Sequence, residues 1–309
     1  MQEIFLLTAS KMTVLFFFMV LGYFFKKKNL TPENTSSVLS KLELYVFLPA
    51  LCFSTFSQNF TRKTVVEKSD ILMWGTVVLV ITGVTSWALS FLFSKDRDTR
   101  AVYTYALTIP NIAYLGYPLI SAVLGDAVLF DFMIFVLPSQ IYIYTIALYI
   151  LNPKHTFSPK SILNPSLIAM FLGAVFGFFD INVPETFMNI FDSAAACMSP
   201  LAMLLSGFIL AKIPVKELIK NPKIYVACAL RLAIYPIVFT ALLYLVGVDS
   251  HTLLLCACLL SLPMGLNNIV FPEAFGGDSK TGAQSCFVCN VLGFISVPIA
   301  FSIIKLLIK

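Results

Sequence analysis

Two proline-containing interruptions break long apolar stretches at corresponding places in the two halves of the chain. The first holds Thr108, Pro110, Asn111 and Tyr114, and the second holds Ser261, Pro263, Asn267 and Asn268. A proline within a helix removes one backbone donor and frees the carbonyl four residues earlier, and lipid satisfies neither group. The neighbouring amides and hydroxyls can donate to carboxylate oxygens or offer oxygen atoms to a cation. The interruptions therefore predict a polar substrate site within a membrane; ordinary proline kinks capped by asparagine are the simpler alternative.

Few other polar residues lie within the apolar stretches, and four of them are candidates for a coupling or support site: Ser139, Gln140, Arg231 and Asn290. Arg231 could pair with the substrate or with a carboxylate, or its long side chain could reach the lipid headgroups. Gln140 and Asn290 could line the site or only hydrogen-bond a neighbouring helix. Glu43 lies nearer a helix end, which favours a role at the membrane interface. Because no carboxylate pair lies near the interruptions, the sequence does not decide between Na⁺ coupling, H⁺ coupling and potential-driven movement.

The chain shows no pattern for a metal site, a cofactor or an enzyme. All seven cysteines fall inside apolar stretches, where free cysteine is usually a small buried hydrophobe. Cys286 and Cys289 have the spacing of metal ligands, but no second Cys or His pair accompanies them. Asp278 lacks the second aspartate that an intramembrane protease would require. A membrane-embedded enzyme is therefore the weaker hypothesis.

The composition predicts an all-α integral membrane protein. Of the 309 residues, 59% are hydrophobic and 12% are charged, which is more apolar surface than a soluble domain needs. A transmembrane helix takes roughly 20 residues, so ten spans use about 200 and leave only short loops. The formal charge of +5 is scattered over those loops, which argues against a nucleic-acid partner and for a lipid bilayer as the surroundings.

Apolar windows between charged or proline-rich breaks predict ten helices, at 4–25, 38–57, 71–93, 101–123, 129–151, 164–179, 187–210, 223–247, 252–274 and 282–307. Connections after odd-numbered helices carry fourteen Lys and Arg residues, whereas the termini and the even-numbered connections carry six. Because Lys and Arg are retained in the cytoplasm, both termini are predicted to lie outside, with the protein in the cell (plasma or inner) membrane.

The two halves resemble each other at a nearly constant offset. Pro49 recurs as Pro200, 151 residues later, and Pro110 maps to Pro263 after 153 residues. The repeats are therefore predicted to cover residues 1–151 and 152–309. Five spans per repeat is an odd number, so the second copy is inverted across the membrane.

Inverted repeats with interrupted helices in equivalent places are typical of secondary transporters, with the substrate near the midplane. In this arrangement the broken helices 4 and 9 cross, and the half-helices after the breaks point their N-termini at the crossing. Each N-terminus offers free N–H groups and about half a positive charge. Two of them converging on one point favour an anion, in particular a carboxylate.

The ten spans, the outside termini, the Pro-centred breaks and the stretch Tyr45-Val46-Phe47-Leu48-Pro49 together resemble the auxin efflux carrier (AEC, PIN-like) family, which includes plant auxin carriers and bacterial malate or malonate permeases. The resemblance covers the whole chain. It implies a fold similar to sodium/proton antiporters and bile-acid symporters, with a scaffold of helices 1, 2, 6 and 7 and a transport domain of helices 3–5 and 8–10. It also implies a homodimer and elevator-type alternating access.

Two departures from the plant pattern narrow the expected substrate. Ile109 occupies the first position of the plant Asn-Pro-Asn motif, of which Pro110-Asn111 remains. Only the short segment from Asn152 to Ser161 stands in place of the long loop between helices 5 and 6. We therefore expect a bacterial-type transporter, secondary active or facilitative, for a small organic anion, such as malate, malonate or an auxin-like acid. A sodium-coupled organic-anion symporter is the alternative.

Overall fold

The structure, a computed structural model, describes residues 2–152, 165–212, 214, 216, 220–275 and 277–307. All regular elements in these ranges are helices, which confirms the all-α class. Four described helices are long and apolar enough to cross a membrane, and a bent pair makes a fifth crossing when it is taken as one span. They are Ser69–Phe93, Glu185–Leu210, Pro222–Leu245 and Ser279–Ile304, with the bent pair Asp126–Phe135 and Leu137–Leu151. Ten spans and the inverted repeat remain predictions, because the other expected ranges are not among the described helices that meet this criterion of length and hydropathy.

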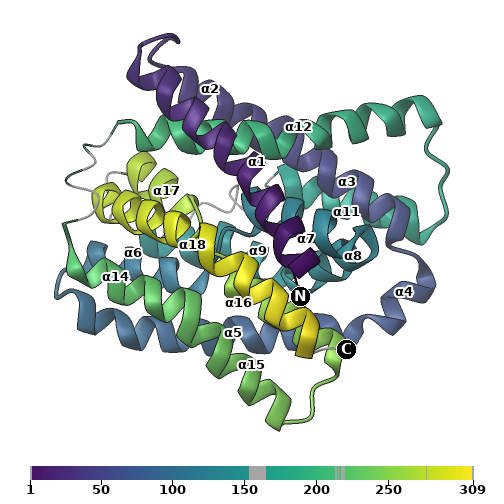
Figure 1. Ribbon diagram of the computed structural model, residues 1–309. Coiled ribbons are helices and arrows are strands. Elements are labelled where there is room, and N and C mark those ends of the chain that lie inside the picture. The colour runs from purple at the N-terminus through teal and green to yellow at the C-terminus, as the bar shows by residue number, and fades with distance from the viewer. Residues whose placement is uncertain are drawn as a thin grey trace.

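The helices follow the expected ranges in order (Figure 1). In the first half they are α1 (Gln2–Lys27), α2 (Thr35–Leu42), η1 (Glu43–Phe47), α3 (Leu48–Asn59), α4 (Arg62–Glu67), α5 (Ser69–Phe93), α6 (Arg97–Thr108), η2 (Ile112–Gly116), α7 (Tyr117–Leu124), α8 (Asp126–Phe135), α9 (Leu137–Tyr142), η3 (Ile143–Ala147) and α10 (Leu148–Leu151). In the second half they are α11 (Pro165–Phe178), α12 (Glu185–Leu210), α14 (Pro222–Ala229), η5 (Leu230–Ile234), α15 (Tyr235–Leu245), α16 (Ser250–Ser261), α17 (Asn267–Phe275) and α18 (Ser279–Leu307).

Three of the π-helical segments, η1, η2 and η5, end two residues before a proline. Pro49, Pro118 and Pro236 each occupy the first turn of the helix that follows. In each case the residue before the proline donates its N–H to the carbonyl five residues earlier, as Leu48 does to Glu43. Since a proline cannot make the usual bond to the fourth preceding carbonyl, the wider turn takes up the mismatch.

The helix expected at 129–151 is bent rather than straight. The helix axis bends by 51° between α8 and the segment that runs from α9 to α10. Pro138 stands in the first turn after the bend and has no N–H to continue the helical ladder.

Small residues allow very close helix packing between α1 and α12. A Cβ atom on Gly207 of α12 would lie 1.9 Å from the Met19 carbonyl oxygen, and one on Gly22 of α1 would lie 2.2 Å from the Leu204 carbonyl oxygen. The two backbones are therefore in direct contact, which only glycine permits. On the other side of α12, α3 packs along both α12 and α11.

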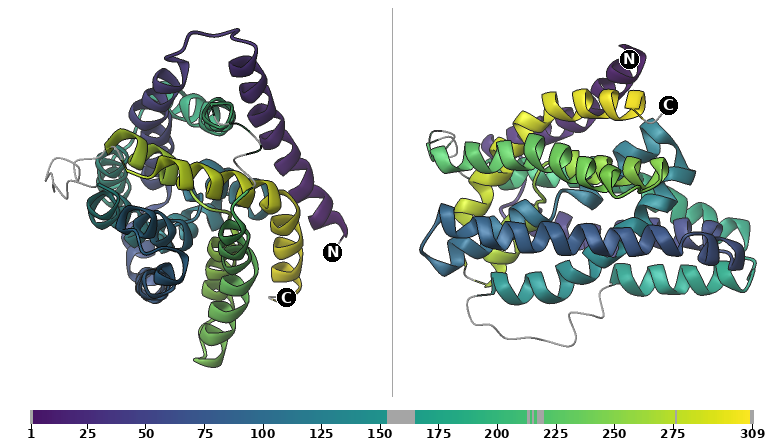
Figure 2. Two further views of the ribbon diagram at one scale, coloured as in Figure 1. Left: turned by 90° about the vertical axis from the view of Figure 1, so that its left-hand side faces the viewer. Right: turned by 90° about the horizontal axis from the view of Figure 1, so that it is seen from below.

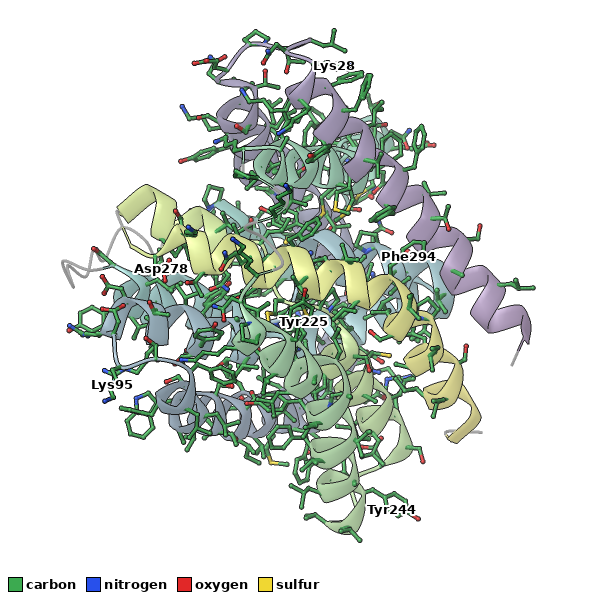
Figure 3. The ribbon with its side chains drawn as sticks, turned by 60° about the vertical axis from the view of Figure 1, so that its left-hand side comes forward. Lys28, Lys95, Tyr225, Tyr244, Asp278 and Phe294 are labelled. Atoms are coloured by element: carbon green, nitrogen blue, oxygen red, sulfur yellow. The ribbon has the colours of Figure 1, made fainter. Side chains whose placement is uncertain are left out.

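The two ends of the chain lie close together in all three ribbon views (Figures 1 and 2). Helix α1 packs beside α18, where the ring of Phe294 (Figure 3) contacts that of Phe16 at a tilt of 43°, with 5.1 Å between the centroids. Lys95 and Asp278 lie at another edge of the molecule (Figure 3), where Thr99 Oγ1 donates to an Asp278 oxygen at 2.8 Å. The same edge therefore holds the connection from α5 to α6 and the one from α17 to α18.

Candidate functional site

The two interruptions cross and pair through their backbones. Pro110 and Met264 form an isolated antiparallel bridge. The Asn111 N–H donates to the Pro263 carbonyl oxygen at 2.7 Å. Each interruption thus supplies hydrogen-bond partners that the other lost when its helix was broken.

A glycine makes this close approach possible. The Gly265 N–H donates to the Ile109 carbonyl oxygen at 3.3 Å, which adds a second bond between the interruptions. A Cβ atom at Gly265 would lie 2.9 Å from the Pro110 carbonyl oxygen. Any larger residue would therefore push the two segments apart.

A small cavity of about 20 Å³ lies at the crossing. Its polar lining comes from α6, from both interruptions and from α9, and comprises Tyr105, Asn111, Tyr114, Gln140 and Asn267. Leu48, at the start of α3, closes it from another part of the fold. A volume of this size holds about one water molecule, so this conformation is closed to a dicarboxylate.

Two asparagine amides at the crossing are buried without hydrogen bonds. Asn111 is 2% exposed and Asn268 is 0% exposed, and within the described chain neither amide nitrogen nor oxygen has a hydrogen-bond partner of normal geometry. The Asn268 side chain lies against the Cys286 thiol, which itself donates to the Gly265 carbonyl at 3.1 Å. Buried amides are usually paired, so the Asn111 amide at the cavity wall is available to a ligand.

Arg231 donates hydrogen bonds to the backbone next to both interruptions. It is 0% exposed and lies in η5. Its Nη1, Nη2 and Nε atoms donate to the carbonyl oxygens of Leu107 at 2.9 Å, Leu259 at 3.0 Å and Leu262 at 3.2 Å. Leu259 would bond to the missing N–H of Pro263 in an unbroken helix. The guanidinium therefore neither reaches the headgroups nor meets a described carboxylate; it satisfies carbonyls that both breaks set free.

Helix α18 holds the second interruption in place. Asn290 donates to the Met264 carbonyl at 3.3 Å and to the Cys286 carbonyl at 2.8 Å. The Met264 N–H in turn lies 3.4 Å from the Cys289 sulfur. Cys286 and Cys289 thus contact the unwound backbone, and no group of three His, Cys, Asp or Glu residues that could hold a metal occurs in the described part of the chain.

Three other predicted site residues, Thr108, Ser261 and Gln140, lie close to the crossing and each already donates a hydrogen bond within the protein. Thr108 and Ser261 donate to carbonyls in their own helices, those of Thr104 and Ala257, both at 2.7 Å. Gln140 lines the cavity and donates to the Tyr117 hydroxyl at 3.0 Å. Ser139 is buried beside it without lining the cavity.

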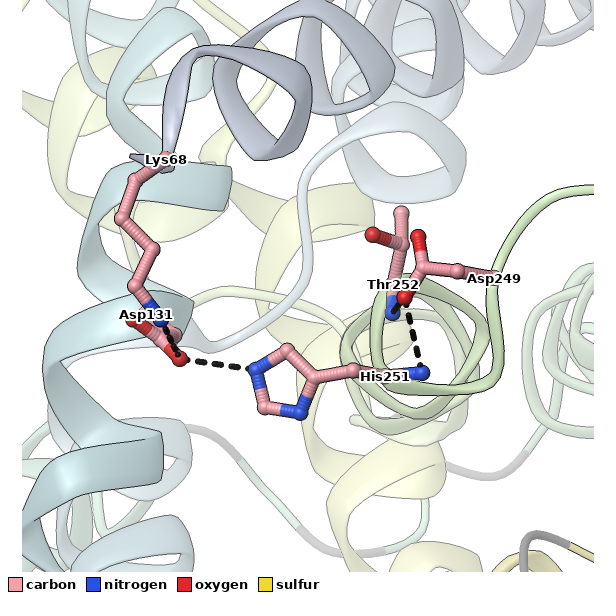
Figure 4. A network of polar contacts seen from close by, with 5 residues as sticks. All are labelled: Lys68, Asp131, Asp249, His251 and Thr252. Atoms are coloured by element: carbon pink, nitrogen blue, oxygen red, sulfur yellow. Dashed lines mark hydrogen bonds and ion pairs between the residues drawn. The ribbon is translucent and has the colours of Figure 1, made fainter. Parts of the chain in front are cut away.

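One ionic cluster was not foreseen from the sequence (Figure 4). Asp131 of α8 is 6% exposed, and its Oδ2 atom lies 2.8 Å from Lys68 Nζ and 2.7 Å from His251 Nε2. The cluster joins the starts of α5 and α16 to α8. The three residues are far apart in the sequence, so no local pattern could have revealed it.

The comparisons with known proteins agree with a membrane function. The family described as Membrane transport protein matches residues 8–158 and 155–301. The chain is 23% identical over 290 residues to the uncharacterized transporter YfdV of Escherichia coli, covering 90% of this chain and 91% of that protein. It is 21% identical over 290 residues to an uncharacterized transporter of Methanothermobacter thermautotrophicus, covering 91% and 93%. A Methanocaldococcus jannaschii transporter, MJ1031, is 20% identical over 294 residues, with 91% and 93% covered.

Proposed function

Because this chain belongs to the membrane transport protein family, and is therefore a transporter rather than an enzyme, we propose that it carries a small organic anion across the cell membrane with its substrate at the crossing of the interrupted helices. A carboxylate such as malate or malonate, or an auxin-like acid, is the proposed substrate. The observation that carries the proposal is the buried Asn111 amide, which has no hydrogen-bond partner in the described part of the chain and lines the cavity at the Pro110–Met264 bridge.

The charges at the crossing support an anion rather than a cation. Two helices, α6 and α16, end there, and two others, η2 with α7 and α17, begin there. The partial charges of two C-termini and two N-termini would cancel if nothing else were present. Arg231 offsets the negative C-termini by donating to their carbonyls, so the positive N-termini are left unbalanced. A carboxylate would complete this arrangement.

Free backbone donors add to this preference. Among the first-turn N–H groups of η2 and α17, those of Ala113 and Asn267 lie at the cavity wall and precede the point where intrahelical bonds begin. Together with the Asn111 amide they can donate to both oxygens of a carboxylate. A sodium-coupled symporter remains the second candidate, because the amide oxygens of Asn111 and Asn268 are also unpaired and could coordinate a hard cation.

For the transport cycle we propose elevator-type alternating access in a homodimer, with ten spans and both termini outside. The scaffold would consist of spans 1, 2, 6 and 7, and the moving domain of spans 3–5 and 8–10. The contact of α1 with α12 and that of α3 with α11 support the scaffold, since they join those spans to one another. The closed cavity at the crossing would open when the moving domain slides past Leu48 of the scaffold.

A ligand screen tests this function. Purified full-length protein in detergent is heated with malate, malonate or indole-acetate, each with and without sodium, and Tm is recorded. A ligand that binds only the folded state raises Tm in a saturable way. We expect such a rise for at least one carboxylate. A rise only with a cation or a neutral solute would contradict the anion site, and a carboxylate effect that requires sodium would favour the symporter.

A further inference from the structure

Glu43 is an ionisable residue that the proposed substrate site does not use. It is 0% exposed, and neither carboxyl oxygen has a hydrogen-bond partner in the part of the chain that the structure describes. The position near a helix end had favoured an interface role for this residue, and that expectation is wrong: the side chain is directed into the protein, not out to the headgroups.

Among the described residues of the elements packed against Glu43, no charged group can neutralise a carboxylate there. The elements packed against η1 are α2, α3, α11 and α12. Their ionisable described residues are Lys41, Cys52, Glu185, Asp192 and Cys197. Lys41 and Glu185 are exposed, and Asp192 accepts a hydrogen bond from Ser54. An ionised carboxylate without a donor or a cation is strongly disfavoured in such a place, so Glu43 is held as the neutral acid.

Glu43 also lies close to the candidate substrate site. The Leu48 N–H donates to the Glu43 carbonyl, which places the two residues one π-helical turn apart on about the same face. Leu48 is 4% exposed and lines the cavity at the crossing. A movement of the substrate-binding elements past Leu48 would therefore change the surroundings of Glu43 as well.

We propose that Glu43 is a proton-binding site that couples carboxylate movement to protons. In the closed conformation Glu43 holds a proton on its carboxyl group. When the neighbouring helices part and water enters, the O–H bond ionises and the proton passes to water on the open side; the carboxylate takes a proton from water before it is buried again. This coupling role rests on the proposed function, whereas the protonated state of Glu43 does not.

Infrared spectroscopy tests the protonated state directly. Spectra of the purified wild type and of Glu43→Gln are compared at pH 7, with Glu185→Gln, an exposed glutamate of α12, as the matched control. We expect a carboxylic-acid C=O band, sensitive to H/D exchange, that is lost in Glu43→Gln and kept in Glu185→Gln. Equal bands in the wild type and Glu43→Gln would show that Glu43 is ionised and would overturn the proposal.

A proteoliposome experiment tests the coupling. Malonate is added outside vesicles that contain a pH-sensitive dye, in sodium-free buffer. The wild type and Glu185→Gln should show a malonate-evoked pH change and uptake driven by an imposed pH gradient, and Glu43→Gln should lose both while malonate still raises its Tm. Wild-type malonate uptake without proton movement would overturn the coupling. Failure of the wild type to take up malonate or the other carboxylates would count against the proposed function instead, and the infrared bands would still decide whether Glu43 holds a proton.

Discussion

Arg231 Nη1 of η5 donates to the carbonyl oxygen of Leu107 at 2.9 Å, so a cation on one helix satisfies the broken end of another. The same guanidinium reaches Leu259 and Leu262 at the second break. A planar group with several donors in fixed directions can serve three carbonyls at once, which a lysine ammonium on its flexible stem cannot do in the same way. Arg231 is therefore the residue that connects the two interruptions electrostatically.

Replacing Arg231 should destabilise the protein strongly. Arg231→Met removes this donor from three buried carbonyls. The Leu259 carbonyl still accepts from the Leu262 N–H at 3.3 Å, so among the described residues the Leu107 and Leu262 carbonyls are left unsatisfied, at a cost of about 1–3 kcal/mol each. We expect a loss of at least about 2 kcal/mol, a much lower Tm in detergent, and an intermediate loss for Arg231→Lys. Arg97→Lys, at the exposed start of α6, is the control and should change Tm little. A wild-type Tm for Arg231→Met would mean that the guanidinium is not needed at the crossing.

Gly207 should not accept a side chain. Gly207→Ala places a Cβ atom 1.9 Å from the Met19 carbonyl oxygen, so α1 and α12 must separate. Gly83→Ala is the matched control, because the nearest atom to a Cβ there is the Thr108 Cγ2 atom at 3.8 Å. We expect poor folding yield or a clear loss of Tm for Gly207→Ala only. Comparable Tm values for the two variants would contradict the observed helix contact.

The ionic cluster at Asp131 should contribute more than an ordinary surface ion pair. Asp131→Asn leaves the half-buried Lys68 without its counter-charge, and removing one partner of a buried pair costs about 3–5 kcal/mol; partial exposure of Lys68 reduces this to about 1–3 kcal/mol. Glu67→Gln is the control, since Glu67 pairs with Lys63 at 3.9 Å in full solvent, where pairs contribute about 0–1 kcal/mol. Thermal unfolding of both variants measures the stability that each one loses. Equal losses for Asp131→Asn and Glu67→Gln would contradict a larger contribution from the Asp131 cluster.

The Asp249 carboxylate should stabilise α16 in a pH-dependent way. Burial opposes its ionisation, but hydrogen bonds from Thr252 and His251 outweigh burial and hold the pKa of Asp249 below its usual value. A lowered pKa in the folded state means that this stability is present above the ordinary pKa of aspartate and is lost as pH falls through the folded value. Asp249→Asn keeps an accepting oxygen at the cap but removes the negative charge, so we expect it to cost about 0.3–1 kcal/mol at pH 7 and progressively less below about pH 4. A difference between variant and wild type that does not shrink in acid would contradict this.

The sequence predicted the helical class and the two interruptions because both depend on local chemistry. Apolar windows and prolines are visible within a few residues, so the breaks at Pro110 and Pro263 could be placed. The π-helical turns before Pro49, Pro118 and Pro236 were missed, although proline chemistry gives a reason for them. The division of several expected spans into shorter helices was also missed.

The roles of the charged residues could not be predicted, because they depend on contacts between distant segments. Arg231 and Leu107 are 124 residues apart, and Lys68 and Asp131 are 63 apart. Glu43 was misjudged because distance from a helix end does not say which way a side chain points. The sequence was enough to select Asn111 as a candidate site residue, but it could not show that the amide is buried at a cavity.

The most direct test of the account is the current evoked by malonate on a solid-supported membrane carrying proteoliposomes, compared among the wild type, Asn111→Ala and Asn34→Ala. Asn34 lies exposed between α1 and α2 and is the control. Losing a hydrogen bond to a charged group costs about 1.5–3 kcal/mol, or roughly 10–100-fold in affinity. We predict a saturable malonate current in the wild type and Asn34→Ala, and an apparent affinity at least about tenfold weaker in Asn111→Ala. Equal currents in all three, or a wild type that responds to a cation or a neutral solute but to no carboxylate, would contradict an anion site at the crossing.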